Sequence, residues 1–184
     1  MALRLKSHWH EDDTDRSLEE IAGAIAFIAW RIAKDKAINL HGERFVYDSD
    51  RQRMGVIREY LYFQVQIVDR MIYGSMEDAD RRTLIVQLAL KLAGHIQENS
   101  TDLMGPGDYG KPFIEGLNSR SQEYSELGFT GDGPSYPFLR HLGHEIQHVM
   151  GEREENRWVI DQVMDKDGWE VYKQFSRAVG DLLE

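Results

Sequence analysis

The clearest chemical pattern in the sequence is the segment 144–148, whose letters HEIQH match the motif HExxH. On a helix, His144 and His148 lie one turn apart, so both can reach a single Zn²⁺ or Fe ion, and Glu145 can polarise a metal-bound water. His141 lies one turn before Glu145 and is a further candidate ligand. These residues define a candidate metal site, in which Glu145 is the catalytic residue if the site hydrolyses a substrate.

The pattern continues as HExxHxxGxxE, with Gly151 and Glu154 at the two later positions. This longer pattern resembles that of the metzincin metalloproteases, in which the glycine permits a turn and a third metal ligand follows three residues later. The resemblance therefore implies that Glu154 is the third ligand. Glu154 can close the site only if the helix ends or bends at Gly151, because in a straight helix it lies about 15 Å along the axis from His144.

The chain also departs from the metzincin pattern. Its third candidate ligand, Glu154, is a carboxylate where the family usually has a histidine. Nothing downstream resembles the methionine turn of the family, and the sequence predicts none of the strands that normally flank such a helix. We therefore do not predict that this chain is a metzincin protease.

Two other interpretations of the same residues stay open. On a helical wheel, Phe138, Leu142 and Ile146 fall on one arc, while the histidines and Glu145 fall on a separate, roughly opposite arc. A polar, solvated helix face that is rich in histidine would explain the pattern without any metal. The unit Glu145-x-x-His148 also occurs in di-iron carboxylate bundles, but those bundles need a second ExxH unit, and the sequence has none.

Composition excludes several classes of function. The chain has 184 residues, no cysteine and a formal net charge of -10. The lack of cysteine excludes a disulfide scaffold, a thiolate nucleophile and zinc sites built on sulfur. The negative charge disfavours nucleic acid and anionic lipid as partners. The most apolar stretch, 21–30, is about half the length needed to cross a bilayer, and we find no signal-peptide pattern, so a cytoplasmic protein is expected.

Helical patterns account for nearly the whole chain. Apolar residues recur at helical spacing over about 17–37, 50–73, 78–98, 112–125, 137–150, 154–164 and 168–183. The sequence therefore predicts an all-α, single-domain bundle of about six or seven helices over residues 1–184, with 1–16 as a flexible lead-in.

Three details of this bundle can be predicted further. Capping residues mark the starts of the first three helices, at Ser17, at Asp48 or Ser49, and at Ser75. The helices that begin near Ser17, Asp50 and Asp78 are predicted to be central to the core. The stretch 78–98 is apolar nearly all round and is the best candidate for its centre. The segment 99–111 is rich in glycine and proline, and it is predicted to be a long, mobile loop.

Two classes of function follow from the sequence. The first is a non-enzymatic helical module that binds a protein or a small molecule and needs no cofactor. The alternative is a protein that binds Zn or Fe through His144, His148 and Glu154 or His141, with or without hydrolytic activity.

Overall fold

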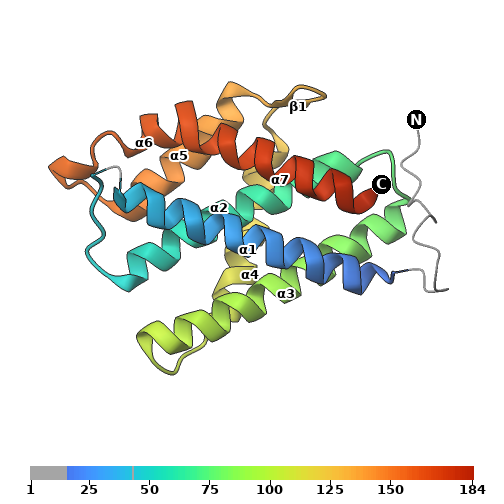
Figure 1. Cartoon of the computed structure of the whole chain (residues 1–184), viewed down its shortest axis with the longest axis horizontal. Coiled ribbons are helices and arrows are strands. Elements are labelled where there is room, and N and C mark those ends of the chain that lie inside the picture. Colours follow the sequence, from blue (N-terminus) through green and yellow to red (C-terminus); the bar gives the residue numbers. More distant parts are fainter. Residues whose placement is uncertain (1–15, 43) are drawn as a thin grey trace.

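The computed structural model describes residues 16–42 and 44–184, so the predicted lead-in lies almost entirely outside the described residues. Within them the chain is a bundle of helices, as the sequence predicts (Figure 1). The elements are α1 (Leu18–Gly42), α2 (Asp50–Ile72), α3 (Asp78–Met104), α4 (Gly110–Ser125), β1 (Phe129–Thr130), β2 (Gly133–Pro134), α5 (Tyr136–Met150), a 3₁₀ turn (Glu154–Asn156), α6 (Val159–Gln162), a π-helical turn (Val163–Asp167) and α7 (Gly168–Leu183).

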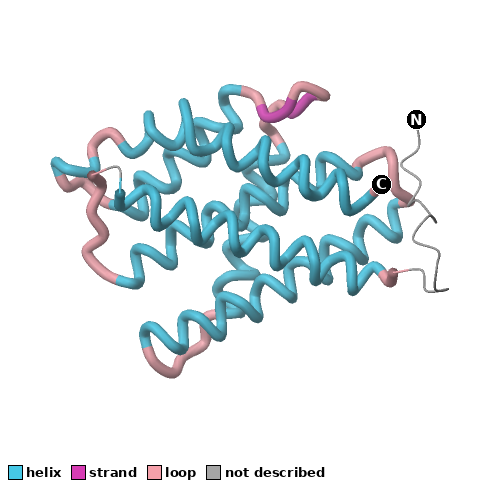
Figure 2. Tube along the Cα trace, viewed as in Figure 1, coloured by secondary structure: helices cyan, strands magenta, loops and turns pink. Residues whose placement is uncertain are grey.

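The strands β1 and β2 form a minimal antiparallel hairpin between α4 and α5, with Phe129 opposite Pro134 and Thr130 opposite Gly133. Figure 2 shows this hairpin in magenta against the cyan helices. None of the helices that the structure describes combines the length and the apolar character needed to cross a bilayer.

The three predicted helix starts agree with the structure, in which α1, α2 and α3 begin at Leu18, Asp50 and Asp78, and two of the three predicted caps are confirmed. At the start of α1, the Ser17 amide donates to Glu20 Oε2 at 2.8 Å, and the Glu20 amide donates to Ser17 Oγ at 3.2 Å, which is a capping box. Ser49 caps α2 by accepting a hydrogen bond from the Gln52 amide. The third predicted cap is wrong, because the Ser75 hydroxyl donates to carbonyls in the last turn of α2, and α3 begins at Asp78 without a side-chain cap.

The centre of the core is α2, and the prediction that α3 forms it is wrong. Every residue from 59 to 68 of α2 is buried, because α2 contacts α1, α3, α4, α5 and α7. In α3, the buried side chains form a single stripe, while Val86 and Leu90 are exposed. The helix α3 therefore has one buried face and one exposed face, although apolar residues lie on both.

The predicted long loop 99–111 is much shorter in the structure. The helix α3 continues to Met104 and α4 begins at Gly110, so only residues 105–109 are irregular. Gln97 holds this short loop in place: its Nε2 donates to the Gly107 carbonyl at 2.8 Å, and its Oε1 accepts from the Tyr109 and Gly110 amides. The glycines signal a tight, hydrogen-bonded connection here and not a long loop.

The segment after α5 packs closely against α5 because two glycines allow it. A Cβ atom on Gly143 would lie 2.9 Å from the Ile160 carbonyl oxygen, and one on Gly168 would lie 2.9 Å from Leu139 Cδ2. The break between the predicted helices 154–164 and 168–183 is instead a π-helical turn that leads directly into α7. Insertions of this type are frequent at functional sites.

A buried asparagine joins two connections that are distant in the sequence. Asn156, in the 3₁₀ turn after α5, is fully buried. Its Oδ1 accepts from the Val46 amide at 2.8 Å, and its Nδ2 donates to the Val46 carbonyl at 2.9 Å. The same Nδ2 donates to the Met150 carbonyl at the end of α5. The side chain therefore pairs with the backbone of the α1–α2 connection much as a neighbouring strand would.

Candidate functional site

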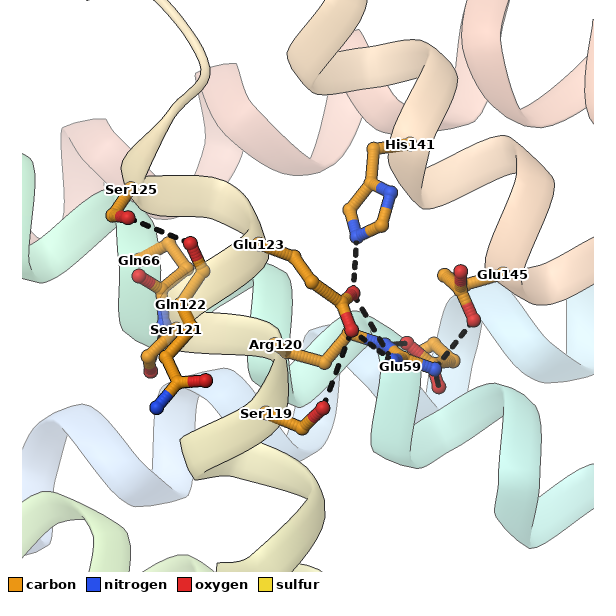
Figure 3. A network of polar contacts seen from close by, with 10 residues as sticks. All are labelled: Glu59, Gln66, Ser119, Arg120, Ser121, Gln122, Glu123, Ser125, His141 and Glu145. Atoms are coloured by element: carbon orange, nitrogen blue, oxygen red, sulfur yellow. Dashed lines mark hydrogen bonds and ion pairs between the residues drawn. The ribbon is translucent and has the colours of Figure 1, made fainter.

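Charged side chains from three helices meet between α2, α4 and α5. Glu59 comes from α2, Arg120 and Glu123 come from α4, and His141 and Glu145 come from α5 (Figure 3). We call these five residues the Arg120 cluster. Glu59 is buried, and the side chains of Arg120, His141 and Glu145 are each less than one-fifth exposed.

Helical spacing and a close helix contact bring these residues together. Arg120 and Glu123 are three residues apart on α4, and His141 and Glu145 are four apart on α5, so each pair projects from one helix face. Gly116, one turn before Arg120, lets α4 approach α2: a Cβ atom there would lie 2.3 Å from the Tyr62 hydroxyl oxygen.

Arg120 is the centre of the cluster. Its Nε and Nη2 each donate to Glu59 at 3.0 Å, which is a two-pronged contact, and its Nη1 donates to both oxygens of Glu123 at 3.1 and 3.2 Å. Its Nη2 also donates to Glu145 Oε2. One guanidinium thus contacts three carboxylates, which matches the planar fork of donors that arginine presents.

His141 lies on the other side of Glu123. Its Nε2 is 2.9 Å from Glu123 Oε2, close enough for an ion pair when the imidazole is protonated. The ring also packs edge-on against Tyr124, with the two ring centroids 4.7 Å apart. The Tyr124 hydroxyl is fully buried and has no hydrogen-bond partner among the described residues. Glu59, Glu145 and Glu123 are close enough to add to the burial that raises the pKa of Tyr124.

The cluster carries more negative than positive charge. Three carboxylates surround one guanidinium, so the formal charge is -2 when His141 is neutral. Burial raises the pKa of Glu59 above its ordinary value, although the hydrogen bonds and charge of Arg120 oppose this increase. Each carboxylate in such a place favours a proton or a further cation nearby.

The same cluster contains a set of possible metal ligands. Within residues 16–42 and 44–184, one group of three histidine or carboxylate side chains has ligand atoms that all lie within 4.8 Å of one another, and it consists of Glu123, His141 and Glu145. Imidazole nitrogen and carboxylate oxygen are both ligands for Zn²⁺ and for iron. Two of the three, His141 and Glu145, are among the residues that the sequence singles out.

The other predicted ligands lie apart from this group. The helix does end at Met150, with Gly151 at a positive φ of 78°, as a ligand role for Glu154 requires. His144, His148 and Glu154 are nevertheless all exposed, and Glu154 pairs with Arg157 at 2.5 Å. No described histidine or carboxylate joins His144 and His148 to make a group of three. The polar arc of α5 is therefore divided into two pairs: His141 and Glu145 are half-buried, whereas His144 and His148 are exposed.

Sequence reasoning missed Glu59, Arg120 and Glu123. The helical pattern of α2 puts Glu59 on a polar face, whereas in the structure its side chain is buried and paired with Arg120. A buried charge of this kind requires an ionic partner, because an unpaired charge there would be costly. Nothing local in α4 distinguishes Arg120 from an ordinary surface arginine.

Comparison with known proteins adds no assignment: no protein-family model, curated protein or solved structure matches the chain.

Proposed function

We propose that the protein is a non-enzymatic helical module that binds one divalent transition-metal ion, Zn²⁺ or Fe²⁺, through Glu123, His141 and Glu145. The observation that carries this proposal is the grouping of three ligand atoms within 4.8 Å of one another. Ligands about 2.0–2.2 Å from a zinc ion are at most about 4.4 Å apart, so small side-chain adjustments are enough to form the site.

Charge balance supports the same proposal. The Arg120 cluster has a formal charge of -2 with neutral His141, and a divalent ion would neutralise it. Metal ions bind the neutral imidazole and the ionised carboxylate, so the affinity should increase as pH rises through the range in which these groups lose their protons. Arg120 holds Glu123 and Glu145 in place through hydrogen bonds, and a bound ion would share these carboxylates with it.

The position of Glu145 supports a non-enzymatic role. Glu145, the candidate base of the HExxH motif, accepts a hydrogen bond from Arg120 and is itself a proposed ligand. The exposed histidines of the motif, His144 and His148, lie outside the proposed site.

The test is metal binding by protein purified without an affinity tag, with titration calorimetry and elemental analysis after dialysis against Zn²⁺. We expect one ion per chain in the wild type. Replacing a direct ligand, as in His141→Ala or Glu145→Gln, should lower the affinity by more than the roughly 10- to 100-fold that loss of an outer-shell partner costs. The matched control is His144→Ala combined with His148→Ala on the same helix, which should bind like the wild type.

The opposite result would contradict the proposed site and would place the metal ion at the HExxH segment. If the His144→Ala, His148→Ala variant loses the ion while His141→Ala keeps it, the site lies on the exposed face of α5. If the wild type binds no ion above the level of a dialysed buffer blank, metal binding is ruled out for both sites.

Arg120→Gln gives an independent test of the charge argument. Arg120 occupies the same carboxylates that the metal would use, so it competes with the ion for their charge. Zn²⁺ should therefore raise the Tm of Arg120→Gln more than that of the wild type. An equal or smaller increase would contradict the proposed location.

A further inference from the structure

A second candidate site lies on the opposite side of α4 from the Arg120 cluster. A solvent-open pocket of about 470 Å³ is formed between α2, α3 and α4, which is within the usual size range of small-ligand sites. Its lining consists of Val65, Gln66, Asp69, Arg70, Tyr73, Arg81, Ile85, Ser121 and Ser125. Figure 3 shows Gln66, Ser121 and Ser125 on the opposite side of α4 from His141 and Glu145. We call it the Arg70 pocket.

Arg70 is the unusual charge in this pocket. Its Nη2 donates to the Tyr124 and Leu127 carbonyls at 2.8 and 3.1 Å, at the C-terminal end of α4. No described carboxylate forms an ion pair with it, and its Nε and Nη1 donate to no described residue. The carbonyls fix the side chain in position without neutralising it, although partial negative charge at a helix C-terminus does stabilise it.

The other charges of the pocket cancel. Arg81 forms a two-pronged ion pair with Asp69, with both N–O distances at 2.9 Å. The lining therefore carries one uncompensated positive charge, in a chain whose formal net charge is -10. A half-buried arginine of this kind favours an anionic group of the ligand and disfavours a cation.

The remaining surface of the pocket provides a hydroxyl and an apolar wall. Ser121 Oγ accepts a hydrogen bond from Gln66 Nε2 at 2.8 Å, which leaves its own O–H available as a donor. Apolar surface comes from Val65, Ile85 and the ring of Tyr73. The centroid of the Tyr73 ring lies 4.9 Å from Arg81 Cζ, which is a cation–π contact. Small-ligand sites commonly combine such an apolar wall with a few polar groups that orient the ligand.

We infer that the Arg70 pocket binds a small organic monocarboxylate, with its carboxylate at Arg70 and Ser121 and its apolar part against Ile85 and Tyr73. This inference is independent of the proposed metal site, because it uses neither the ligands nor the charge of the Arg120 cluster.

The test is a titration of the ¹⁵N-labelled protein with benzoate, in which the chemical shifts of the backbone amides are monitored by NMR. The buffer contains EDTA, so that metal plays no part. Benzylamine has the same ring with the opposite charge, and inorganic phosphate has the charge without the ring. We expect saturable shifts with benzoate at residues of α2, α3 and α4 around the pocket. Benzylamine and phosphate should each bind at least about tenfold more weakly, since each lacks one of the two interactions.

Two variants locate the binding. Arg70→Gln keeps an amide that can donate to the α4 carbonyls but removes the charge, and it should weaken benzoate at least about tenfold. Arg82→Gln, an exposed position of α3, is the matched control and should leave binding unchanged. Ile85→Trp fills the pocket without altering its charge and should abolish binding, so it serves as the test if Arg70→Gln does not fold.

Three results would overturn the inference. The first is the absence of saturable shifts with benzoate. The second is binding of benzylamine or phosphate as tight as that of benzoate. The third is benzoate binding that persists in both Arg70→Gln and Ile85→Trp.

Discussion

The Arg120 cluster and the network around Lys36 both place one cation among carboxylates in the interior, and they differ in how many acids surround it. Lys36 of α1 lies 3.8 Å from Asp167 and also pairs with Glu170, at the π-helical turn and the start of α7. The Asp167 side chain is 6% exposed, whereas that of Glu170 is 48% exposed. Water therefore solvates the carboxylate of Glu170, one of the two acids in the Lys36 network.

This difference is the reason why we propose a metal ion at only one of these networks. The Lys36 network has two acids for one cation and no histidine, and its lysine is a single point of charge. The Arg120 cluster has three acids for one cation, with His141 as a nitrogen ligand beside them. A larger excess of carboxylates over cations, next to an imidazole, is what separates this candidate ligand site from the Lys36 network.

The largest expected effect comes from Arg120→Gln. Removing this guanidinium leaves Glu59, Glu123 and Glu145 without their shared cation, and breaking a buried pair in this way costs about 3–5 kcal/mol. Urea unfolding at neutral pH in EDTA measures the free energy of unfolding. A loss below about 1 kcal/mol would mean that the three carboxylates reach solvent and do not need Arg120.

Lys36→Met should have a smaller effect, with a loss of about 1–3 kcal/mol. Glu170 can turn into water once its partner is gone, and Asp167 keeps the hydrogen bond from Gln162 Nε2 at 3.2 Å. The same urea series measures the loss. If it equals or exceeds that of Arg120→Gln, the number of surrounding acids does not explain the contrast between the two networks.

The pH dependence of stability should report on Glu59. Burial raises its folded-state pKa above the ordinary 4.5, so its contribution to stability is complete below pH 4.5 and is lost as pH rises through the folded-state pKa. Glu59→Gln removes this titration. The free energy of unfolding of the wild type should therefore fall relative to that of Glu59→Gln as pH rises above 4.5, and parallel curves would contradict the assignment.

Glu170→Gln should have the smallest effect, less than about 1 kcal/mol, because half-exposed ion pairs contribute little. The hydrogen bond and charge of Lys36 lower the pKa of Glu170, so its small contribution is present at neutral pH and is lost as pH falls through the folded-state pKa. Thermal unfolding at low and high salt measures it. A loss as large as that of Lys36→Met would show that Glu170, and not Asp167, is the main partner of Lys36.

The fold class could be predicted from the sequence, but the layers of the bundle could not. Helical periodicity and the capping box at Ser17 depend on neighbouring residues, and both are confirmed. Which helix lies at the centre depends on how many partners surround it. The apolar residues of α3 therefore predicted a central position that α2 occupies, although α2 contains several charged and polar side chains.

The candidate site shows the same limit. The HExxH pattern draws attention to α5, and two of the candidate residues on this helix, His141 and Glu145, lie in the Arg120 cluster. Their partners Glu59 and Arg120 are 61 residues apart in the chain, so no local spacing links them. Only the packing of α4 against α2, which Gly116 permits, brings the two charges into contact.

The pairing of Asn156 with Val46 has a consequence for hydrogen exchange. Two connections separated by 110 residues share their hydrogen bonds through one buried side chain, so neither can open without exposing the other. The amide protons around Val46 and around Asn156 should therefore exchange with deuterium at a common rate, as one cooperative unit. In Asn156→Ala this unit would divide, and the α1–α2 connection would exchange first, while the three helices that hold the Arg120 cluster keep their protection.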